Sequence, residues 1–327
     1  MQTVTMEDVA RAAGVSRALV SLAYRDAYGV SAETRDHILA AGKKLGYRPN
    51  RVAAQLAGKQ QLTIGVFLQD LHNSLFADIH DGIRSVTDAQ GKHTVLAVGK
   101  IDGSKDIEAL ETLLENRVDI VIAAGLTLAD RDLKRYVSRL KLVSVTRVVA
   151  GADSIFSDNQ LGARLATEHL ISLGHRKIVF IANPPSDGHL DRRLGYETTM
   201  LEHNLVPSVV AGSYSRQETE VITRDILQVE NRPTAIFAHN DQAALGVMDA
   251  AFALGLTPGK DLAVVGYDNS TASKTPSIGL TSVDVHGFEL GRLAAEAAMA
   301  RLDDPEANPR VENLEPTLVI RRSSSGL

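Results

Sequence analysis

Arg17 stands at the start of a short helical pattern, next to side chains that suit contact with nucleic-acid bases. Its guanidinium carries parallel N–H donors whose geometry matches the two acceptors on the major-groove edge of guanine. Ala18 and Leu22 are apolar and can meet a thymine methyl group or leave room for it. The alternative is an exposed arginine on an ordinary surface helix, so the interpretation depends on the elements around Arg17.

Hydroxyl residues at or near the expected helix starts form a second set suited to DNA. Helix N-termini and hydroxyl side chains bind phosphate oxygens, which fixes the position of a protein on the duplex. We expect this role for Thr5, Ser16, Ser21, Ser31 and Thr34.

Two short helices are predicted by the stretch "TMEDVARAAGVSRALVSLAYR". Thr5 caps the first helix with Asp8 three residues later, Gly14 ends it, and Ser16 caps the second. Apolar residues at helical spacing let the two helices pack on each other. The inward residues are expected to be Met6, Val9, Ala10, Ala13, Val15, Leu19, Val20 and Ala23.

A third helix fits "SAETRDHILAAGKKLG", with Ser31 as its cap and Gly46 at its end. Ile38, Leu39 and Leu45 are expected to face the core of the three helices. Three helices around one small core give an all-α helix-turn-helix head over residues 1–49, with Arg17 at the end of the second helix that enters the major groove.

Charge supports the same interpretation. Residues 1–61 hold nine Lys and Arg against five Asp and Glu, a net charge of +4, whereas the rest holds 26 against 35, a net charge of −9. A basic head on an acidic body favours contact between the head and a polyanion.

Beyond residue 61, apolar runs rich in β-branched residues alternate with helical stretches. The runs are "LTIGVFL", "HTVLAVG", "VDIVIAAG", "KLVSVT", "KIVFIAN", "TAIFAHN" and "LAVVGYD". Strands that are apolar throughout are covered on both faces, so the pattern predicts an α/β body with parallel sheets. The alternation runs through two halves, with a break near "SIFSDNQLG".

Ligands of such sheets bind outside the carboxyl ends of the strands. Carboxylate, amide and guanidinium groups there suit vicinal hydroxyls, and flat rings suit the apolar face of a sugar. The candidate ligand-binding residues are Asn73, Phe76, Arg147, Phe156, Arg192, Tyr214, Asn240 and Asp268. Three alternatives remain open: Asp241 as a helix cap, Asp268 as a turn residue and Phe76 as part of the core.

The segments "VTMEDVARAAGVSRALVSLAYR", "VSAETRDHILAAGKKLGYRPNRVAAQLAGKQQ" and "TIGVFL" resemble the lactose-repressor/galactose-repressor (LacI/GalR) family of bacterial transcriptional regulators, and the resemblance covers essentially the whole chain. It implies a homodimeric regulator, most simply a repressor, that binds double-stranded operator DNA under the control of a small-molecule effector. It also implies a body of two periplasmic-binding-protein-like lobes joined by three crossovers. Arg192, Asn240 and Asp268 match the family's recurrent effector contacts.

The domain limits follow from this resemblance. We expect the head at 1–49, a hinge helix and linker at 50–61, and an effector-binding and dimerisation domain at 62–327. Lobe 1 is expected at about 62–158 and 288–316, and lobe 2 at about 159–287 and 317–327.

The linker "NRVAAQLAGKQQ" spans about two helical turns between Asn50 as cap and Gly58 as end. Such a helix is marginal alone, and the resemblance implies that two copies pair on DNA through Val52 and Ala53, with Leu56 as a wedge in the minor groove. The linker residues expected to contact DNA are Asn50, Arg51, Ala53 and Leu56. The alternative is a plain linker whose leucine covers the core of the head.

Two departures from the family pattern, at Val285 and Leu22, limit what carries over. Val285, flanked by Asp284 and His286, stands where many members place a glutamine that reaches the effector. Leu22 replaces a polar base-reading residue of many members. The chain ends in "RRSSSGL" without a leucine heptad, which favours a dimer over a tetramer.

Other classes of protein are disfavoured. The sequence has no cysteine, no apolar run long enough to span a membrane and no N-terminal apolar run, so we expect a cytoplasmic protein without membrane contact. Common phosphate-loop, nucleophile-elbow, zinc-protease and dinucleotide motifs are missing, so we expect no enzyme, no cofactor and no metal site. A sugar or polyol is the expected effector, with a nucleobase-responsive regulator and a transport-type sugar-binding protein as alternatives.

Overall fold

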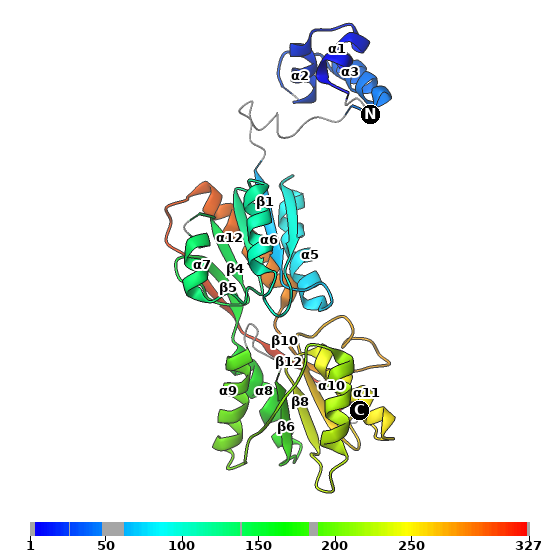
Figure 1. Cartoon of the computed structure of the whole chain (residues 1–327), viewed down its shortest axis with the longest axis vertical. Coiled ribbons are helices and arrows are strands. Elements are labelled where there is room, and N and C mark those ends of the chain that lie inside the picture. The colour runs from blue at the N-terminus through cyan, green and yellow to red at the C-terminus, as the bar shows by residue number, and fades with distance from the viewer. Residues whose placement is uncertain (1–3, 26, 48–61, 138, 183–188, 326–327) are drawn as a thin grey trace. The chain divides into compact units, whose positions relative to one another are not determined.

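The computed structural model describes residues 4–25, 27–47, 62–137, 139–182 and 189–325, and the chain forms two compact units, Met1–Gln61 and Leu62–Leu327. The first unit contains three helices, α1 (Met6–Ala13), α2 (Arg17–Tyr24) and α3 (Ala32–Leu45) (Figure 1). The second is an α/β body. The predicted combination of a helix-turn-helix head with a two-lobed body of mainly parallel sheets is confirmed.

Side-chain caps start each helix of the head. The Thr5 hydroxyl accepts a hydrogen bond from the Asp8 amide, while the Thr5 amide donates to the Asp8 carboxylate at 2.9 Å, which completes a capping box. Ser16 and Ser31 cap α2 and α3 by accepting a hydrogen bond from the amides of Leu19 and Thr34, without the reciprocal bond of a capping box. Gly14 has a φ of 66°, in the left-handed region that glycine adopts without strain, and it ends α1 as predicted.

The core of the head differs from the prediction at two leucines. Val9, Val20 and Ile38 are fully buried where the three helices meet, but Leu39 and Leu45 are exposed. Leu39 follows Ile38 by one residue, a rotation of about 100° around the helix, so only one of the two can face inward. Small residues complete the inner face of α3, since Gly42 lies against the Tyr24 ring.

Lobe 1 is built on a parallel sheet of six strands in the order β11-β5-β4-β3-β1-β2. Its strands are β1 (Thr63–Leu68), β2 (His93–Val98), β3 (Ile120–Ala124), β4 (Leu142–Val145), β5 (Asp153–Ser157) and β11 (Val311–Leu314). The helices that cover it are α5 (Ser74–Ala89), α6 (Asp106–Glu115), α7 (Asp130–Val137) and α12 (Gly287–Asp303).

Lobe 2 repeats this plan with the strand order β12-β10-β9-β8-β6-β7. Its strands are β6 (Ile178–Ala182), β7 (Ser208–Ala211), β8 (Ala235–Ala238), β9 (Ala263–Tyr267), β10 (Thr281–Asp284) and β12 (Thr317–Val319). Its helices are α8 (Asn159–Ser172), α9 (His189–Glu202), α10 (Arg216–Leu227), α11 (Asp241–Ala253) and α13 (Arg322–Ser325). The strand β12 pairs antiparallel with β10, so this sheet is parallel except at one edge.

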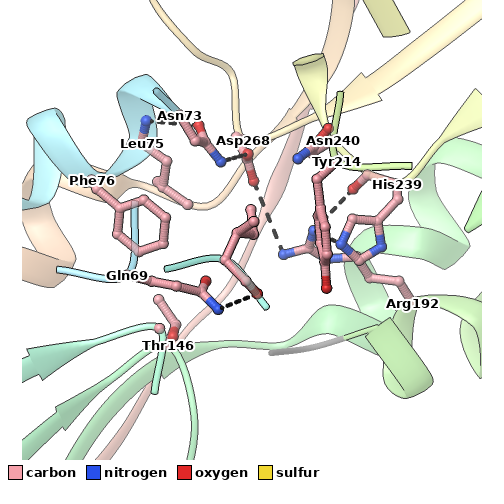
Figure 2. Close-up of a pocket in the computed structure, with 12 residues that line it drawn as sticks. Gln69, Asn73, Leu75, Phe76, Thr146, Arg192, Tyr214, His239, Asn240 and Asp268 are labelled. Atoms are coloured by element: carbon pink, nitrogen blue, oxygen red, sulfur yellow. Dashed lines mark hydrogen bonds and ion pairs between the residues drawn. The ribbon is translucent and has the colours of Figure 1, made fainter. Parts of the chain in front are cut away.

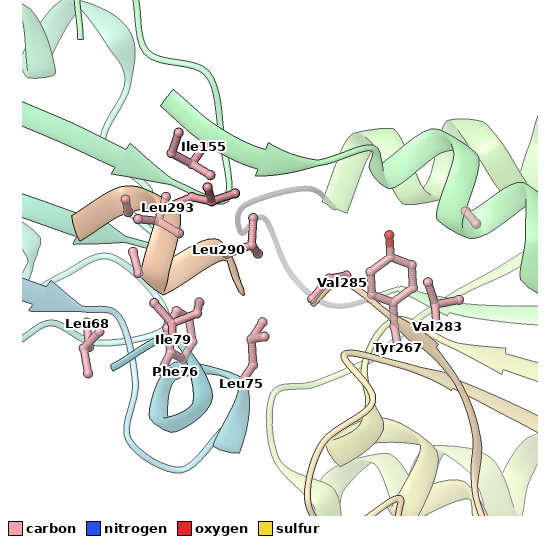
Figure 3. Close-up of a cluster of buried hydrophobic side chains, with 14 of the residues drawn as sticks. Leu68, Leu75, Phe76, Ile79, Ile155, Tyr267, Val283, Val285, Leu290 and Leu293 are labelled. Carbon is pink, nitrogen blue, oxygen red and sulfur yellow. The ribbon is translucent and has the colours of Figure 1, made fainter. Parts of the chain in front are cut away.

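The chain passes between the lobes three times. The first crossover follows β5, the second joins β10 to α12, and the third joins β11 to β12. A short strand from the C-terminal part of the chain, β11 in lobe 1 and β12 in lobe 2, therefore completes each sheet. One apolar cluster extends through both lobes: Figure 3 shows Val283 and Val285 near Tyr267 on the lobe 2 side, and Leu290 and Leu293 on the lobe 1 side.

Candidate functional site

A small pocket of about 50 Å³ lies between the two lobes, where the strands of both sheets end at their carboxyl sides. Figure 2 shows its side chains converging from opposite walls. The lobe 1 wall is formed by Gln69, Asn73, Leu75, Phe76, Ile101, Gly125 and Thr146. The lobe 2 wall is formed by Arg192, Tyr214, His239, Asn240 and Asp268. This is the position where open α/β sheets bind ligands.

Asn73 joins the two walls. Its carboxamide oxygen accepts a hydrogen bond from the Leu75 amide at 3.0 Å and so caps α5. Its amide nitrogen donates to Asp268 Oδ2 at 2.9 Å. A second bond between the lobes runs from Gln242 to the carbonyl of His72 at 3.1 Å. Lobe 1 is thus tied to lobe 2 at the mouth of the pocket.

Arg192 is held in the pocket by several contacts on lobe 2. It donates to the Asn159 side chain at 2.8 Å and to the carbonyl of His239 at 2.9 Å. Its guanidinium also lies over the Tyr267 ring, with the central carbon 3.9 Å from the ring centre, a cation–π geometry. One edge remains directed toward Asp268, with Nη2 at 4.0 Å from Oδ1 (Figure 2). The guanidinium is therefore preorganised beside a carboxylate.

Asp268 is almost completely buried, and burial raises the pKa of its carboxyl group to about 7, although the nearby charge of Arg192 lowers it. Among the described residues, its Oδ1 accepts no hydrogen bond. A buried carboxylate oxygen without a donor costs free energy. A hydroxyl group of a ligand would supply the missing donor.

The lobe 1 wall contains a second buried polar group that lacks a hydrogen-bond partner among the described residues. The Thr146 hydroxyl is buried and has no hydrogen-bond partner within the described part of the chain. Phe76 presents its ring to the pocket while also packing in the large apolar cluster, so the core and pocket interpretations both apply to it. Gly125 has a φ of 80°, and a Cβ atom there would lie 2.9 Å from the Phe76 ring, so a larger residue would disturb this wall.

Six of the eight residues predicted for ligand binding line this pocket, and two do not. Arg147 donates to the carbonyls of Leu126 and Leu128 at 3.2 and 3.0 Å and pairs with Asp130, so loops of lobe 1 engage its guanidinium. Phe156 lies within β5, where its backbone pairs with β11, and the ring is not at the pocket. Both were chosen because a guanidinium and a flat ring near the crossover suit a sugar, and neither property specifies the direction in which the side chain extends.

The structure adds pocket residues that the sequence analysis did not select. Gln69 and Thr146 directly follow β1 and β4, so the strand-end rule that selected Asn240 would have found them. At α11 the helix cap is Asn240, whose side chain accepts from the Ala243 amide at 2.9 Å. Asp241, considered as the cap, is instead buried and accepts a hydrogen bond from the Ser270 amide at 2.7 Å.

In the head, the residues predicted to read bases lie on the outer face of α2. Arg17 and Ala18 are exposed, and Ser21 and Leu22 are partly exposed. Thr5, Ser16 and Ser31 are exposed at helix starts, and Thr34 donates its amide to the Ser31 hydroxyl. The linker residues Asn50, Arg51, Ala53 and Leu56 lie outside the described residues.

The described ranges contain neither a metal-binding cluster nor a membrane-spanning helix. No group of three or more His, Cys, Asp or Glu side chains there is arranged to hold a metal ion. No described helix is long and apolar enough to cross a membrane.

Comparison with known proteins agrees with this architecture. Residues 5–50 match the family "Bacterial regulatory proteins, lacI family", and residues 167–324 match "Periplasmic binding protein-like domain". The chain is 30% identical to the Ribose operon repressor of Haemophilus influenzae over 98% of both chains. It is 33% identical to the Lactose operon repressor of Escherichia coli, over 99% of this chain and 91% of the repressor.

A solved structure of the Lac repressor dimer bound to operator and the anti-inducer ONPF superposes with a TM-score of 0.84 and 32% identity, over 98% of this chain and 99% of that one. The similarity thus extends through the head and both lobes. The chain belongs to the lacI family of bacterial regulatory proteins and is a DNA-binding transcriptional regulator.

Proposed function

We propose that the protein is a cytoplasmic repressor, acting as a homodimer, whose affinity for a pseudo-palindromic operator is controlled by a sugar or polyol bound between the lobes. The observation that carries this proposal is that Asp268 Oδ1 and the Thr146 hydroxyl, on facing walls of one pocket, both have no hydrogen-bond partner among the described residues. Hydroxyl groups can donate and accept, so a polyhydroxylated molecule satisfies both. The proposed function requires no catalytic residue.

The pocket as it stands is too small for such a ligand, since ligand pockets usually enclose about 300–1,000 Å³. Binding therefore requires the lobes to move apart or rotate, and the Asn73–Asp268 bond to open or rearrange. We infer that this movement changes the separation of the two Asn50–Gly58 segments in a dimer. The effector then controls DNA affinity through a coupling free energy between the pocket and the linker.

A thermal-shift screen identifies the class of effector. D-ribose, D-galactose, cellobiose, ribitol, hypoxanthine and guanine are tested separately at millimolar concentration. A ligand at 100 times its Kd stabilises the folded state by about 2.7 kcal/mol, which is easily measured. Stabilisation by a sugar or polyol is expected, and stabilisation by a nucleobase alone would contradict the proposed class.

Substitution of Arg192 then tests the site. Arg192→Ala should abolish stabilisation by the active compound and its effect on DNA binding, because the guanidinium faces the pocket. Affinity for a DNA site selected from a random library, measured without the compound, should remain close to wild type. Arg193→Ala is the matched control, since Arg193 is exposed and pairs with Glu197. An unchanged response in Arg192→Ala would move the site elsewhere.

Arg17 tests the head. Arg17→Ala should cost about 1–3 kcal/mol on the selected DNA site and much less on random DNA, if its guanidinium reads a base. Arg11→Ala serves as control, because Arg11 is an exposed arginine on α1 that faces Asp8. Equal losses on both DNAs would make Arg17 a phosphate contact.

A further inference from the structure

Asn269 follows the pocket residue Asp268 in a loop whose backbone is unusual. Asp268 has a φ of 101° and Asn269 a φ of 48°, both positive values that residues other than glycine seldom adopt. The Asn269 amide donates to the Ser282 hydroxyl at 2.9 Å, and the residue is only 5% exposed. The hydrogen bond of the buried Asn269 therefore holds the loop that carries Asp268 in place.

The Asn269 side chain bonds to the last residue of β10 and to a residue that follows β12, two segments of lobe 2. Its amide nitrogen donates to Asp284 Oδ2 at 2.8 Å, at the end of β10 and just before the second crossover. Its carboxamide oxygen accepts from Arg321 at 2.7 Å, beyond the third crossover and β12. One buried carboxamide thus contacts both segments, using a donor and an acceptor.

Asp284 continues the chain of bonds toward lobe 1. Its Oδ1 accepts from the His286 amide at 2.7 Å. His286 has a φ of 59° and directly precedes α12, which packs along α5 in lobe 1. The helix α5 in turn begins at Asn73, the residue that reaches Asp268. Two routes thus connect the pocket to the second crossover. One runs through the hydrogen bonds of Asn269 and Asp284, and the other through Asn73 and the packing of α5 on α12.

We propose that Asn269 is a positioning residue that sets the angle between the lobes, by holding the Asp268 loop to the second crossover through Asp284 while Arg321 anchors it within lobe 2. Displacement of Asp268 shifts Asn269, and through it Asp284 and the strained turn at His286. The link to effector response rests on the proposed function, because it requires a ligand at Asp268. The geometric part of the proposal does not require any ligand.

The competing explanation is that Asn269 only stabilises its own loop. Reversing the direction of the hydrogen bond between residues 269 and 284 distinguishes the two explanations. In Asn269→Asp, two carboxylates face each other and the donor to Asp284 is lost. In Asn269→Asp combined with Asp284→Asn, the new amide at 284 can donate to the carboxylate at 269, which restores the bond with its direction reversed.

The readout is the distance between the lobes, measured by double electron–electron resonance. The chain has no cysteine, so spin labels attach only at introduced cysteines. Ile107→Cys on α6 of lobe 1 and Val221→Cys on α10 of lobe 2 replace side chains that are 45% and 58% exposed. Labelled chains are diluted with unlabelled protein so that distances within one chain dominate. Neither DNA nor any effector is present.

We expect Asn269→Asp to displace and broaden the distance distribution relative to the wild type, and the double substitution to return it. Asn231→Asp, in the exposed loop before β8, adds the same charge and should leave the distribution unchanged. Asp284→Ala removes the carboxylate that accepts hydrogen bonds from the Asn269 side chain and from the His286 amide. Because residue 284 is partly exposed, this variant provides a second test if Asn269→Asp does not fold. It should displace the distribution in the same way.

A wild-type distribution in Asn269→Asp and in Asp284→Ala would overturn the proposal. So would a displaced distribution that the double substitution fails to return although it restores the melting temperature. The result is separable from the proposed function. A displaced distribution with an intact effector response in Arg192→Ala leaves the role of Asn269 standing and removes the assigned effector site.

Discussion

Asp268 combines three properties that are rarely found in one side chain. It is buried, it lies in a backbone conformation of positive φ, and one of its oxygens has no donor among the described residues. Each property costs free energy in the folded protein. Such a cost is retained where a ligand recovers it, which is the reason that we place Asp268 at the centre of recognition.

The raised pKa of Asp268 predicts a pH dependence of stability. Because the folded-state pKa is about 7 and the usual value is 3.8, the folded protein binds more protons between these values than the unfolded chain does. This carboxyl group therefore lowers the free energy of unfolding as the pH rises from about 4 to about 7. Above that range its effect is constant.

Asp268→Asn should remove this contribution. The free energy of unfolding of the variant, relative to the wild type, should rise from pH 5 to pH 8, as measured by urea denaturation at each pH. Glu306→Gln, an exposed carboxylate after α12, is the charge control and should show no such rise. A difference between Asp268→Asn and wild type that stays constant over this range would contradict the assignment.

Residue chemistry joined to a strand end predicted two of the pocket residues directly, whereas Arg192, which lies within α9, was supported by its match to the family's effector contacts. Asn240 and Asp268 follow β8 and β9 closely, and the carboxyl ends of parallel strands meet at one edge of a sheet. Arg147 also follows a strand, yet its long side chain turns back to carbonyls of its own lobe. The direction of a flexible side chain depends on partners distant in sequence, which spacing does not reveal.

At the level of elements, the crossing of α5 and α12 has the closest backbone approach in lobe 1. A Cβ atom on Gly82 would lie 2.0 Å from the Phe288 carbonyl, and one on Gly291 would lie 1.9 Å from the Ile79 carbonyl. Neither distance is compatible with a side chain, and the neighbouring atoms are backbone. The two glycines let α12, which arrives from the second crossover, join lobe 1.

Gly291→Ala should therefore destabilise the body, although alanine is the better helix former by about 1 kcal/mol. The added methyl group forces the helices apart, and overpacking of this kind costs about 1–3 kcal/mol. The measurement is the urea midpoint of the full chain. Ala300→Gly, on the exposed end of the same helix, is the control for helix propensity and should lose about 1 kcal/mol. A more stable Gly291→Ala would show that the crossing relaxes.

The sequence predicted the elements that are long or apolar throughout and missed those that are short. All seven predicted strands are present, whereas β7, β10, β11 and β12 have three or four residues each and were not assigned as strands. The five-residue strand β5 was also missed, because its residues overlap the stretch interpreted as the break between the two halves. Edge strands such as β7 and β11 consist of exposed and partly exposed residues, so their sequences resemble those of loops. Their pairing depends on tertiary contacts rather than on local preference.

For the whole molecule, the uneven charge predicts how DNA binding responds to salt. The head and linker carry a net charge of +4 and the body −9, so the favourable interactions with phosphates come from residues 1–61. Counterion release then makes affinity fall by orders of magnitude between 50 and 200 mM salt, if about six or more phosphates are contacted. Fluorescence anisotropy with labelled DNA, repeated over this range, measures the slope.

Lys43→Gln combined with Lys44→Gln, at the exposed end of α3, provides the comparison for this slope. If these side chains do not contact phosphates, the slope remains as in the wild type, and each lost contact reduces it by about one. An affinity that is independent of salt in the wild-type protein would exclude phosphate contacts as the basis of binding.

The three passes of the chain between the lobes have a consequence for the order in which the protein can form on the ribosome. The sheet of lobe 1 lacks β11, and α5 lacks its partner α12, until residues 287–314 have been made, and the sheet of lobe 2 then still lacks β12. A nascent chain that stops near residue 280 therefore holds most of two sheets but can finish neither. The sheet of lobe 1 can be completed only after residue 314 has left the exit tunnel and that of lobe 2 only after residue 319 has, so both lobes reach their final form near the end of synthesis.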